Sequence, residues 1–182
     1  MREKTLYARL AWTGMRKNRR LYLPYLLSCA GMVLMFYILM GLSGSPVLEH
    51  MSGGGSSAII LRLGTVVIAV FALIFLFYTH SFLIRRRERE FGLYNVLGMG
   101  KGNIARILLW ETVITYGLTT GTGLLLGVVL YKLAELGMVR LLQVPVTYTL
   151  TVSVSSLLAA AALFAAIHLS LIHISEPTRR RG

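Results

Sequence analysis

The chain has 182 residues, of which 55% are hydrophobic and only 14% are charged, and its mean hydropathy is +0.68. Soluble domains carry about 25% charged residues, so this composition excludes an ordinary soluble domain and indicates an integral membrane protein. The formal charge of +12 comes from 19 Lys and Arg against 7 acidic residues. Because the basic residues flank apolar runs, we attribute the charge to positive-inside topology and attraction to anionic lipid rather than to nucleic-acid binding. Cys29 is the only cysteine, so no disulfide framework is expected.

Residues 1–20 predict a cytoplasmic amphipathic helix that lies in the membrane interface, for which simple anchoring is favoured over a specific partner site. The other face is basic, and the apolar face consists of Leu6, Tyr7, Leu10, Trp12 and Met15. Residues 21–42 predict the first transmembrane helix, because 22 residues rising 1.5 Å each cover roughly 33 Å. This apolar run is longer than the core of a signal peptide, so we expect it to be retained as a signal anchor.

Three further apolar runs predict transmembrane helices over residues 58–84, 104–134 and 152–171. Residues 43–57 are rich in Ser and Gly and are expected to form an extracellular loop, and residues 135–151 a second extracellular segment. Basic residues gather before the first helix and directly after the second, which places these ends and the N-terminus in the cytoplasm. The predicted fold class is therefore an all-α integral membrane protein with four transmembrane helices.

Residues 85–103, RRREREFGLYNVLGMGKGN, form the most informative segment. Four arginines interleaved with two glutamates are followed by an apolar stripe and then by glycines that end a helix. We expect a cytoplasmic helix that runs along the membrane surface, a tight turn, and a return into the membrane at Asn103, which is a plausible N-cap. A charged, amphipathic segment in this position favours contact with a soluble partner.

The third predicted span contains two glycine pairs with GxxxG spacing, which favour close approach of another helix. The predicted packing residues are Gly117, Gly121, Gly123 and Gly127. The same span contains Glu111, an acid that is costly within a membrane and normally has a partner or a function. Pairing with Arg106 or a neighbouring helix, and a role in functional coupling, both remain open for this buried acid.

No catalytic, cofactor-binding or metal-binding residues are predicted. The stretch from Gly98 to Asn103 superficially resembles a phosphate loop, but Asn95 and Gly102 stand where that motif needs Gly and Ser or Thr. The end of the chain, LSLIHISEPTRRRG, resembles translated sequencing-adapter read-through. We therefore expect residues 169–182 to be a non-native tail and the chain to be a truncated fragment.

Residues 77–101, FYTHSFLIRRREREFGLYNVLGMGK, resemble the FtsX-like permease family of ABC transporters. Within that family they are most similar to the bacitracin-resistance type permeases of Gram-positive bacteria, which handle antimicrobial peptides. Residues 8–20, the loop around residues 46–51, and the early Trp-Glu-Thr of residues 110–112 with its glycine pairs fit the same branch. The resemblance covers nearly the whole chain up to about His168.

The resemblance implies a non-catalytic permease subunit in the cell membrane, coupled to a separate subunit that binds and hydrolyses ATP. It also implies export or detoxification of antimicrobial peptides, or signalling about them through a membrane histidine kinase. Family members are several-fold longer, with a second helical bundle and a large extracellular domain that this sequence does not include. The alternative is a small four-span membrane scaffold or regulator without transport activity.

The resemblance further implies that the segment after the second span docks on the ATPase subunit and passes its motion to the membrane helices. Charged residues would orient this contact and apolar ones would form its centre. The expected coupling residues are Arg86, Arg87, Glu88, Glu90, Phe91, Gly92, Leu93, Tyr94, Leu97, Gly98 and Met99.

Overall fold

The computed structural model describes residues 2–49, 52–96, 100–142 and 153–175, and within these ranges the secondary structure is helical. The helices are α1 (Arg2–Lys17), α2 (Arg19–Ser43), α3 (Pro46–Glu49), α4 (Gly54–Val96), α5 (Lys101–Leu142) and α6 (Val154–Ser175). Four of the described helices, α2, α4, α5 and α6, are long and apolar enough to cross a membrane. The prediction of an all-α protein with four membrane-spanning helices is therefore confirmed.

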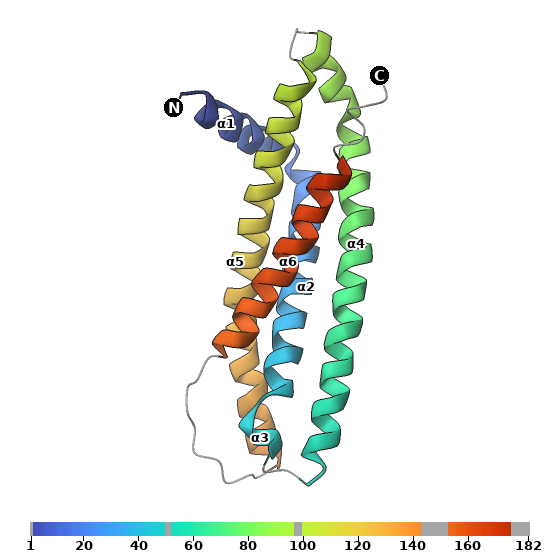
Figure 1. Ribbon diagram of the computed structural model, residues 1–182. Coiled ribbons are helices and arrows are strands. Elements are labelled where there is room, and N and C mark those ends of the chain that lie inside the picture. The colour runs from blue at the N-terminus through green and yellow to red at the C-terminus, as the bar shows by residue number, and fades with distance from the viewer. Residues whose placement is uncertain (1, 50–51, 97–99, 143–152, 176–182) are drawn as a thin grey trace.

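The four long helices run along a common axis, and α1 lies across one end of the bundle (Figure 1). We call this the α1 end and the opposite end, where α3 lies, the α3 end. Helix α2 is the centre of the bundle and packs against α4, α5 and α6. Its buried residues recur every three or four positions, which is the spacing of a helix face turned toward neighbours. They include Tyr22, Tyr25, Cys29, Val33, Phe36, Tyr37 and Gly41.

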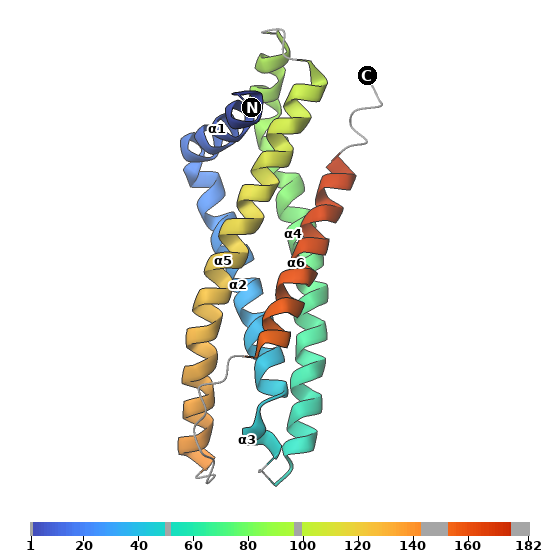
Figure 2. The ribbon, with the colours of Figure 1, turned by 60° about the vertical axis from the view of Figure 1, so that its left-hand side comes forward.

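Helices α4 and α5 are far longer than the membrane requires. Their 43 and 42 residues correspond to roughly 65 and 63 Å, about twice the hydrocarbon thickness of a bilayer. At the α1 end both helices project beyond α1 (Figures 1 and 2). The exposed side chains of Arg62 and Arg85 bracket an apolar stretch of roughly 34 Å on α4, so the projecting part follows Arg85.

Three expectations about boundaries differ from the structure. Residues 85–96 continue α4 without a break, so they do not form a separate helix. The predicted loop at 43–57 contains α3 and the first turn of α4, and α5 stays helical to Leu142 within the segment expected to be extracellular. Charged residues end an apolar span, but Arg, Glu and Leu all favour a helix, so the helix itself continues.

Helix α5 packs against α2 along a ridge in which every fourth residue is buried. From the α1 end to the α3 end the ridge consists of Glu111, Thr115, Thr119, Gly123, Gly127, Tyr131 and Glu135. At its middle, a Cβ atom on Gly123 would lie 2.7 Å from the Ala30 carbonyl oxygen, and one on Gly127 would lie 3.0 Å from the Tyr37 ring. The other glycine pair, Gly117 and Gly121, is exposed, and a Cβ atom there would meet no described atom within 4 Å.

Helix α1 packs mainly against α5. Ala11 and Met15 are buried, and the Tyr7 hydroxyl donates to Asn103 Oδ1 at 3.0 Å. Helix α5 begins at Lys101, so Asn103 is its third residue and not its N-cap. Leu6 and Trp12 remain about half exposed, so α1 buries one side and leaves an apolar side open to lipid.

The two glycine pairs should respond oppositely to a methyl group. We expect Gly123→Ala to lower the free energy of unfolding by about 1–3 kcal/mol, because its Cβ would overpack against the α2 backbone. Gly121→Ala should cost nothing and add up to about 1 kcal/mol through helix propensity. Denaturant unfolding in detergent micelles measures both, and equal losses would contradict the assignment of the packing face.

Candidate functional site

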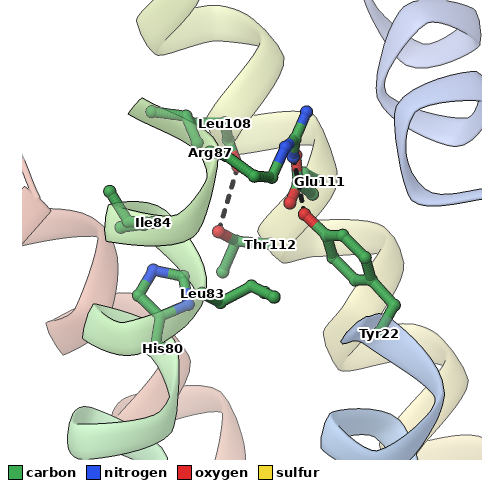
Figure 3. Close-up of a pocket in the computed structure, with 8 residues that line it drawn as sticks. All are labelled: Tyr22, His80, Leu83, Ile84, Arg87, Leu108, Glu111 and Thr112. Atoms are coloured by element: carbon green, nitrogen blue, oxygen red, sulfur yellow. Dashed lines mark hydrogen bonds and ion pairs between the residues drawn. The ribbon is translucent and has the colours of Figure 1, made fainter. Parts of the chain in front are cut away.

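A buried arginine near the α1 end connects three of the long helices. Arg87 of α4 is 3% exposed, whereas its neighbours Arg85 and Arg86 are exposed. Its Nη1 atom donates to Glu111 Oε2 of α5 at 2.5 Å and to the Tyr22 hydroxyl of α2 at 2.5 Å (Figure 3). We call these residues, Tyr22, Arg87 and Glu111, the Arg87 cluster.

Helix periodicity explains why this arginine points inward. The buried face of α4 runs through Ala72, Leu76 and Leu83, and Arg87 lies one further helical turn along the same face. At residues 85–87 one face of α4 is therefore still packed against α2. The first two of these three arginines point outward, and the third meets the bundle.

Helix α1 also approaches the cluster. A Cβ atom on Gly14 would lie 3.0 Å from Arg87 Nη2, so glycine at this position lets α1 come close to the guanidinium group. The guanidinium carbon also lies 5.7 Å from the centre of the Tyr22 ring, within the range of a cation–π contact. Four helices, α1, α2, α4 and α5, therefore meet around one side chain.

The Arg87 cluster is surrounded mostly by apolar side chains, so each charge of the Arg87–Glu111 pair needs the other. A small pocket beside it is lined by His80, Leu83, Ile84, Leu108 and Thr112, and the Thr112 hydroxyl donates to the Leu108 carbonyl at 3.0 Å (Figure 3). Coulomb attraction is strong in such apolar surroundings, and an unpaired charge there is costly. Glu111 and Arg87 therefore each supply what the other requires in order to stay ionised and buried.

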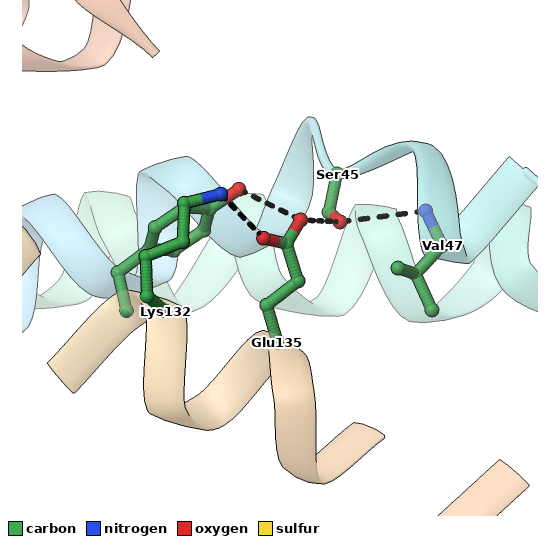
Figure 4. A network of polar contacts seen from close by, with 5 residues as sticks. Ser45, Val47, Lys132 and Glu135 are labelled. Carbon is green, nitrogen blue, oxygen red and sulfur yellow. Dashed lines mark hydrogen bonds and ion pairs between the residues drawn. The ribbon is translucent and has the colours of Figure 1, made fainter. Parts of the chain in front are cut away.

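A second polar network lies near the α3 end of the same helix. Glu135 of α5 is 8% exposed and accepts hydrogen bonds from Ser45 Oγ at 2.8 Å, Tyr131 Oη at 3.1 Å and Lys132 Nζ at 2.7 Å (Figure 4). The Ser45 oxygen also accepts from the Val47 backbone N–H at 3.4 Å. Glu135 thus fastens α5 to the connection between α2 and α3.

The separation of the two networks corresponds to a membrane thickness. Residues 111 and 135 are 24 positions apart on α5, which is roughly 36 Å, close to the hydrocarbon thickness of about 30 Å. Both buried acids consequently lie near the two ends of the apolar part of the bundle. The cost of an acid within a span singles out Glu111 alone from the sequence. The signal for the other network is the spacing of Tyr131, Lys132 and Glu135 at i, i+1 and i+4.

The structure separates the predicted coupling residues by environment. Arg86 is exposed with its guanidinium carbon 5.1 Å from the Phe82 ring centre, and Gly92 and Leu93 are exposed near the end of α4. Arg87 lies in the buried cluster instead. Of the remaining predicted residues, Glu88, Glu90, Phe91 and Tyr94 belong to α4, and Leu97, Gly98 and Met99 lie outside the described residues.

The partner of Glu111 comes from a neighbouring helix. Arg106, the other partner considered from the sequence, is exposed, and its guanidinium carbon lies 5.8 Å from the centre of the Tyr7 ring of α1. The acid in the span is therefore explained structurally by the ion pair with Arg87. The same pair connects the projecting part of α4 to the rest of the bundle.

These observations define a class of protein. Four of the described helices are of membrane-spanning length, and two of them project well beyond the apolar zone, which is the architecture of a multi-pass membrane protein. Residues 62–177 match the FtsX-like permease C-terminal family, and because this match covers well over half of the sequence, the chain belongs to the FtsX-like permease family of ABC transporters.

The relatives place it within that family. The chain is 27% identical over 155 residues to the bacitracin export permease protein BceB of Halalkalibacterium halodurans, covering 85% of this chain and 24% of that protein. It is 24% identical over 159 residues to BceB of Bacillus subtilis, covering 87% and 25%. An uncharacterized ABC transporter permease of Bacillus subtilis, YvcS, is 25% identical over 160 residues, again covering 87% and 25%. The chain thus spans about a quarter of the length of these relatives.

Breaking the Arg87 cluster should destabilise the bundle. We expect Arg87→Met to lower the free energy of unfolding by about 3–5 kcal/mol, because it leaves Glu111 buried without its cation. Replacing both residues by Met should recover most of this loss, since neither charge then remains. The measurement is denaturant unfolding in detergent, with the exposed neighbour Arg86→Met as the matched control, expected within about 0.5 kcal/mol of the unchanged protein.

Two results would contradict a coupled buried pair. The first is a double Met variant whose loss of unfolding free energy equals the sum of the losses of Arg87→Met and Glu111→Met. The second is a loss for Arg86→Met that equals the loss for Arg87→Met.

Proposed function

We propose that the chain is the N-terminal part of a permease subunit that couples ATP hydrolysis by a separate ATPase subunit to the handling of antimicrobial peptides. The handling would consist of export or detoxification, or of signalling through a membrane histidine kinase. Family membership and the similarity to the bacitracin export permeases support this function. The chain itself would be non-catalytic, with ATP bound by the partner.

The observation that carries the proposal is the projecting end of α4. Beyond the apolar stretch that ends at Arg85, this helix continues to Val96 and rises past α1 (Figures 1 and 2). Leu93 and Val96 there are 60% and 85% exposed, and the exposed Arg85 and Arg86 lie about two to three helical turns earlier on the same helix. Apolar side chains outside the hydrocarbon zone, with charges on the same helix, suit a protein partner rather than lipid.

The Arg87 cluster would transmit the motion of that partner. Arg87 stands on α4 between the projecting end and the membrane-spanning part, and it bonds to α2 and α5. Because α4 is one continuous helix, a displacement of its end moves Arg87 as well. The bonded helices must then follow, or the buried pair must rearrange. Among the proposed coupling residues, the exposed Arg86, Gly92 and Leu93 would belong to the contact, and the buried Arg87 would be the transmitter.

The proposal requires the α1 end to be cytoplasmic. The positive-inside rule supports this, since Arg9, Arg16, Lys17, Arg19 and Arg20 all lie in or beside α1 and are exposed. At the α3 end the apolar zone of the described helices is bordered by Arg62, Lys132 and Arg140.

Cysteine labelling tests this orientation. In a Cys29→Ala background, Val96→Cys and Leu141→Cys are matched positions, because both native side chains are 85% exposed and they lie at opposite ends of the bundle. A membrane-impermeant maleimide added to intact cells should label Leu141→Cys at once and Val96→Cys only after permeabilisation. Immediate labelling of Val96→Cys on intact cells would place the proposed docking end outside and overturn the proposal.

Charge substitutions test the docking. We expect Leu93→Asp or Val96→Asp to reduce co-purification of the proposed ATPase subunit at least tenfold, because a carboxylate would be desolvated in the contact. Leu141→Asp introduces the same charge at the opposite end and should leave co-purification unchanged. Quantitative pull-down of the full-length permease from membranes is the measurement.

Membrane insertion of each variant, measured by carbonate extraction, serves as the control. Unchanged recovery of the ATPase with both α4 variants would remove the docking role. A permease gene without any neighbouring ATPase gene would instead favour the four-span scaffold.

A further inference from the structure

A second, larger pocket opens on the side of the α1–α2 corner. It has a volume of about 190 Å³ and is open to the outside between α1, α2 and α5. Most of its lining is apolar, and these residues are Trp12, Met15, Leu23, Leu26 and Leu118. Trp12 and Leu23 are 50% and 61% exposed, so the pocket opens sideways from the bundle, where the lipid lies.

Two guanidinium groups complete the lining. Arg16, at the end of α1, and Arg19, at the start of α2, are both exposed and both line the pocket. The buried acids Glu111 and Glu135 pair with Arg87 and Lys132, so neither of them neutralises Arg16 or Arg19. Apolar walls and two cations from adjoining helices thus meet in one cavity.

This combination matches one kind of molecule. An acyl chain fits an apolar cavity that opens to lipid, and a phosphate group at the interface matches two guanidinium groups. Zwitterionic lipid carries a compensating cation near its phosphate, so the paired arginines favour a lipid with net negative charge. The position agrees, since α1 lies across the bundle next to the end of the apolar zone (Figure 1).

We propose that this pocket binds one anionic phospholipid. Its phosphate would lie between Arg16 and Arg19, and an acyl chain would extend along Leu23, Leu26 and Leu118. The inference does not depend on docking of the ATPase subunit. Such a site differs from the general attraction of a basic helix to an anionic leaflet, because only Arg16 and Arg19 of the exposed basic residues in and beside α1 line the pocket.

The bound lipid would also contact the Arg87 cluster. Tyr22 lines this pocket and the small pocket beside Arg87 alike, and its hydroxyl accepts a hydrogen bond from Arg87. A lipid chain that fills the cavity would restrict the Tyr22 ring to the position in which this bond forms. Anionic lipid would then stabilise the cluster that connects α4 to α2 and α5.

Tryptophan fluorescence gives a direct test, because the chain has only two tryptophans, Trp12 and Trp110. In a Trp110→Phe background of the full chain, Trp12 reports from the pocket lining. The protein is reconstituted in phosphatidylcholine nanodiscs, and brominated phosphatidylglycerol or brominated phosphatidylcholine is added in steps as the quencher. We expect quenching by brominated phosphatidylglycerol to saturate at a much lower mole fraction than quenching by brominated phosphatidylcholine.

A charge-matched pair of variants separates the pocket from general electrostatics. Arg16→Gln/Arg19→Gln should reduce the preference for phosphatidylglycerol by roughly thirtyfold, from about a tenfold change per 1.4 kcal/mol and about 1 kcal/mol per arginine. Arg9→Gln/Arg20→Gln lowers the net charge equally at exposed positions that do not line the pocket. This control pair should retain most of the preference.

Two outcomes overturn the proposal. If both double variants reduce the preference equally, the effect is that of net charge alone. If the unchanged protein shows equal quenching by the two brominated lipids, the pocket has no selectivity for anionic lipid. Circular dichroism of each variant confirms that helix content is retained, so that lost quenching reports lost binding.

Discussion

A charged side chain that helix periodicity turns into an apolar bundle must find an opposite charge, and this requirement organises the α1 end of the protein. Arg87 satisfies it with Glu111 and Tyr22, and Gly14 allows α1 to approach the same group. Because neither charge tolerates burial alone, the relative positions of α2, α4 and α5 are fixed at this point. Helices α4 and α5 otherwise contact each other little compared with their contacts to α2. The ion pair therefore links α4 directly to α5 within the bundle, away from the chain connection that joins their ends.

The transmembrane helices and the buried acid could be predicted from the sequence more readily than the contact between Glu111 and Arg87. Apolar run length located four spans, and the cost of an acid in a span singled out Glu111. Its partner was harder to identify, because Arg87 belongs to a run of arginines and resembles a solvated surface residue. Only helix phase, followed from Ala72, Leu76 and Leu83, distinguishes it from its exposed neighbours. Local composition thus predicts that the apolar span of α4 ends at these arginines. Which arginine is buried depends on which face of α4 packs against the other helices.

The glycines make the same point about packing. Gly117 with Gly121 and Gly123 with Gly127 have identical spacing, yet only the second pair faces α2. The ridge that contains Gly123 and Gly127 continues at the same spacing into buried threonines and ends in a buried acid at each side. A search for every fourth small or polar residue would have identified this ridge from the sequence, whereas the GxxxG pattern alone selects both pairs. Helix ends were predicted less well, because the charges that end an apolar span are themselves compatible with helix.

The placement of the two polar networks bears on how the protein would respond to force. Glu111 and Glu135 hold α5 to its neighbours near both ends of the apolar zone, and the small residues between them let α5 pack closely on α2. Helices α2 and α5 are therefore expected to move together, because sliding one past the other would disturb both networks and the glycine contact. Helix α4 is held differently, because only 11% of its most apolar 18-residue window is buried, against 39% of the corresponding window of α2. A displacement of the projecting end of α4 would consequently act on a rigid α2–α5 pair through Arg87. Tyr22, which bonds Arg87 and lines the pocket at the membrane surface, is where the surrounding lipid would adjust that link.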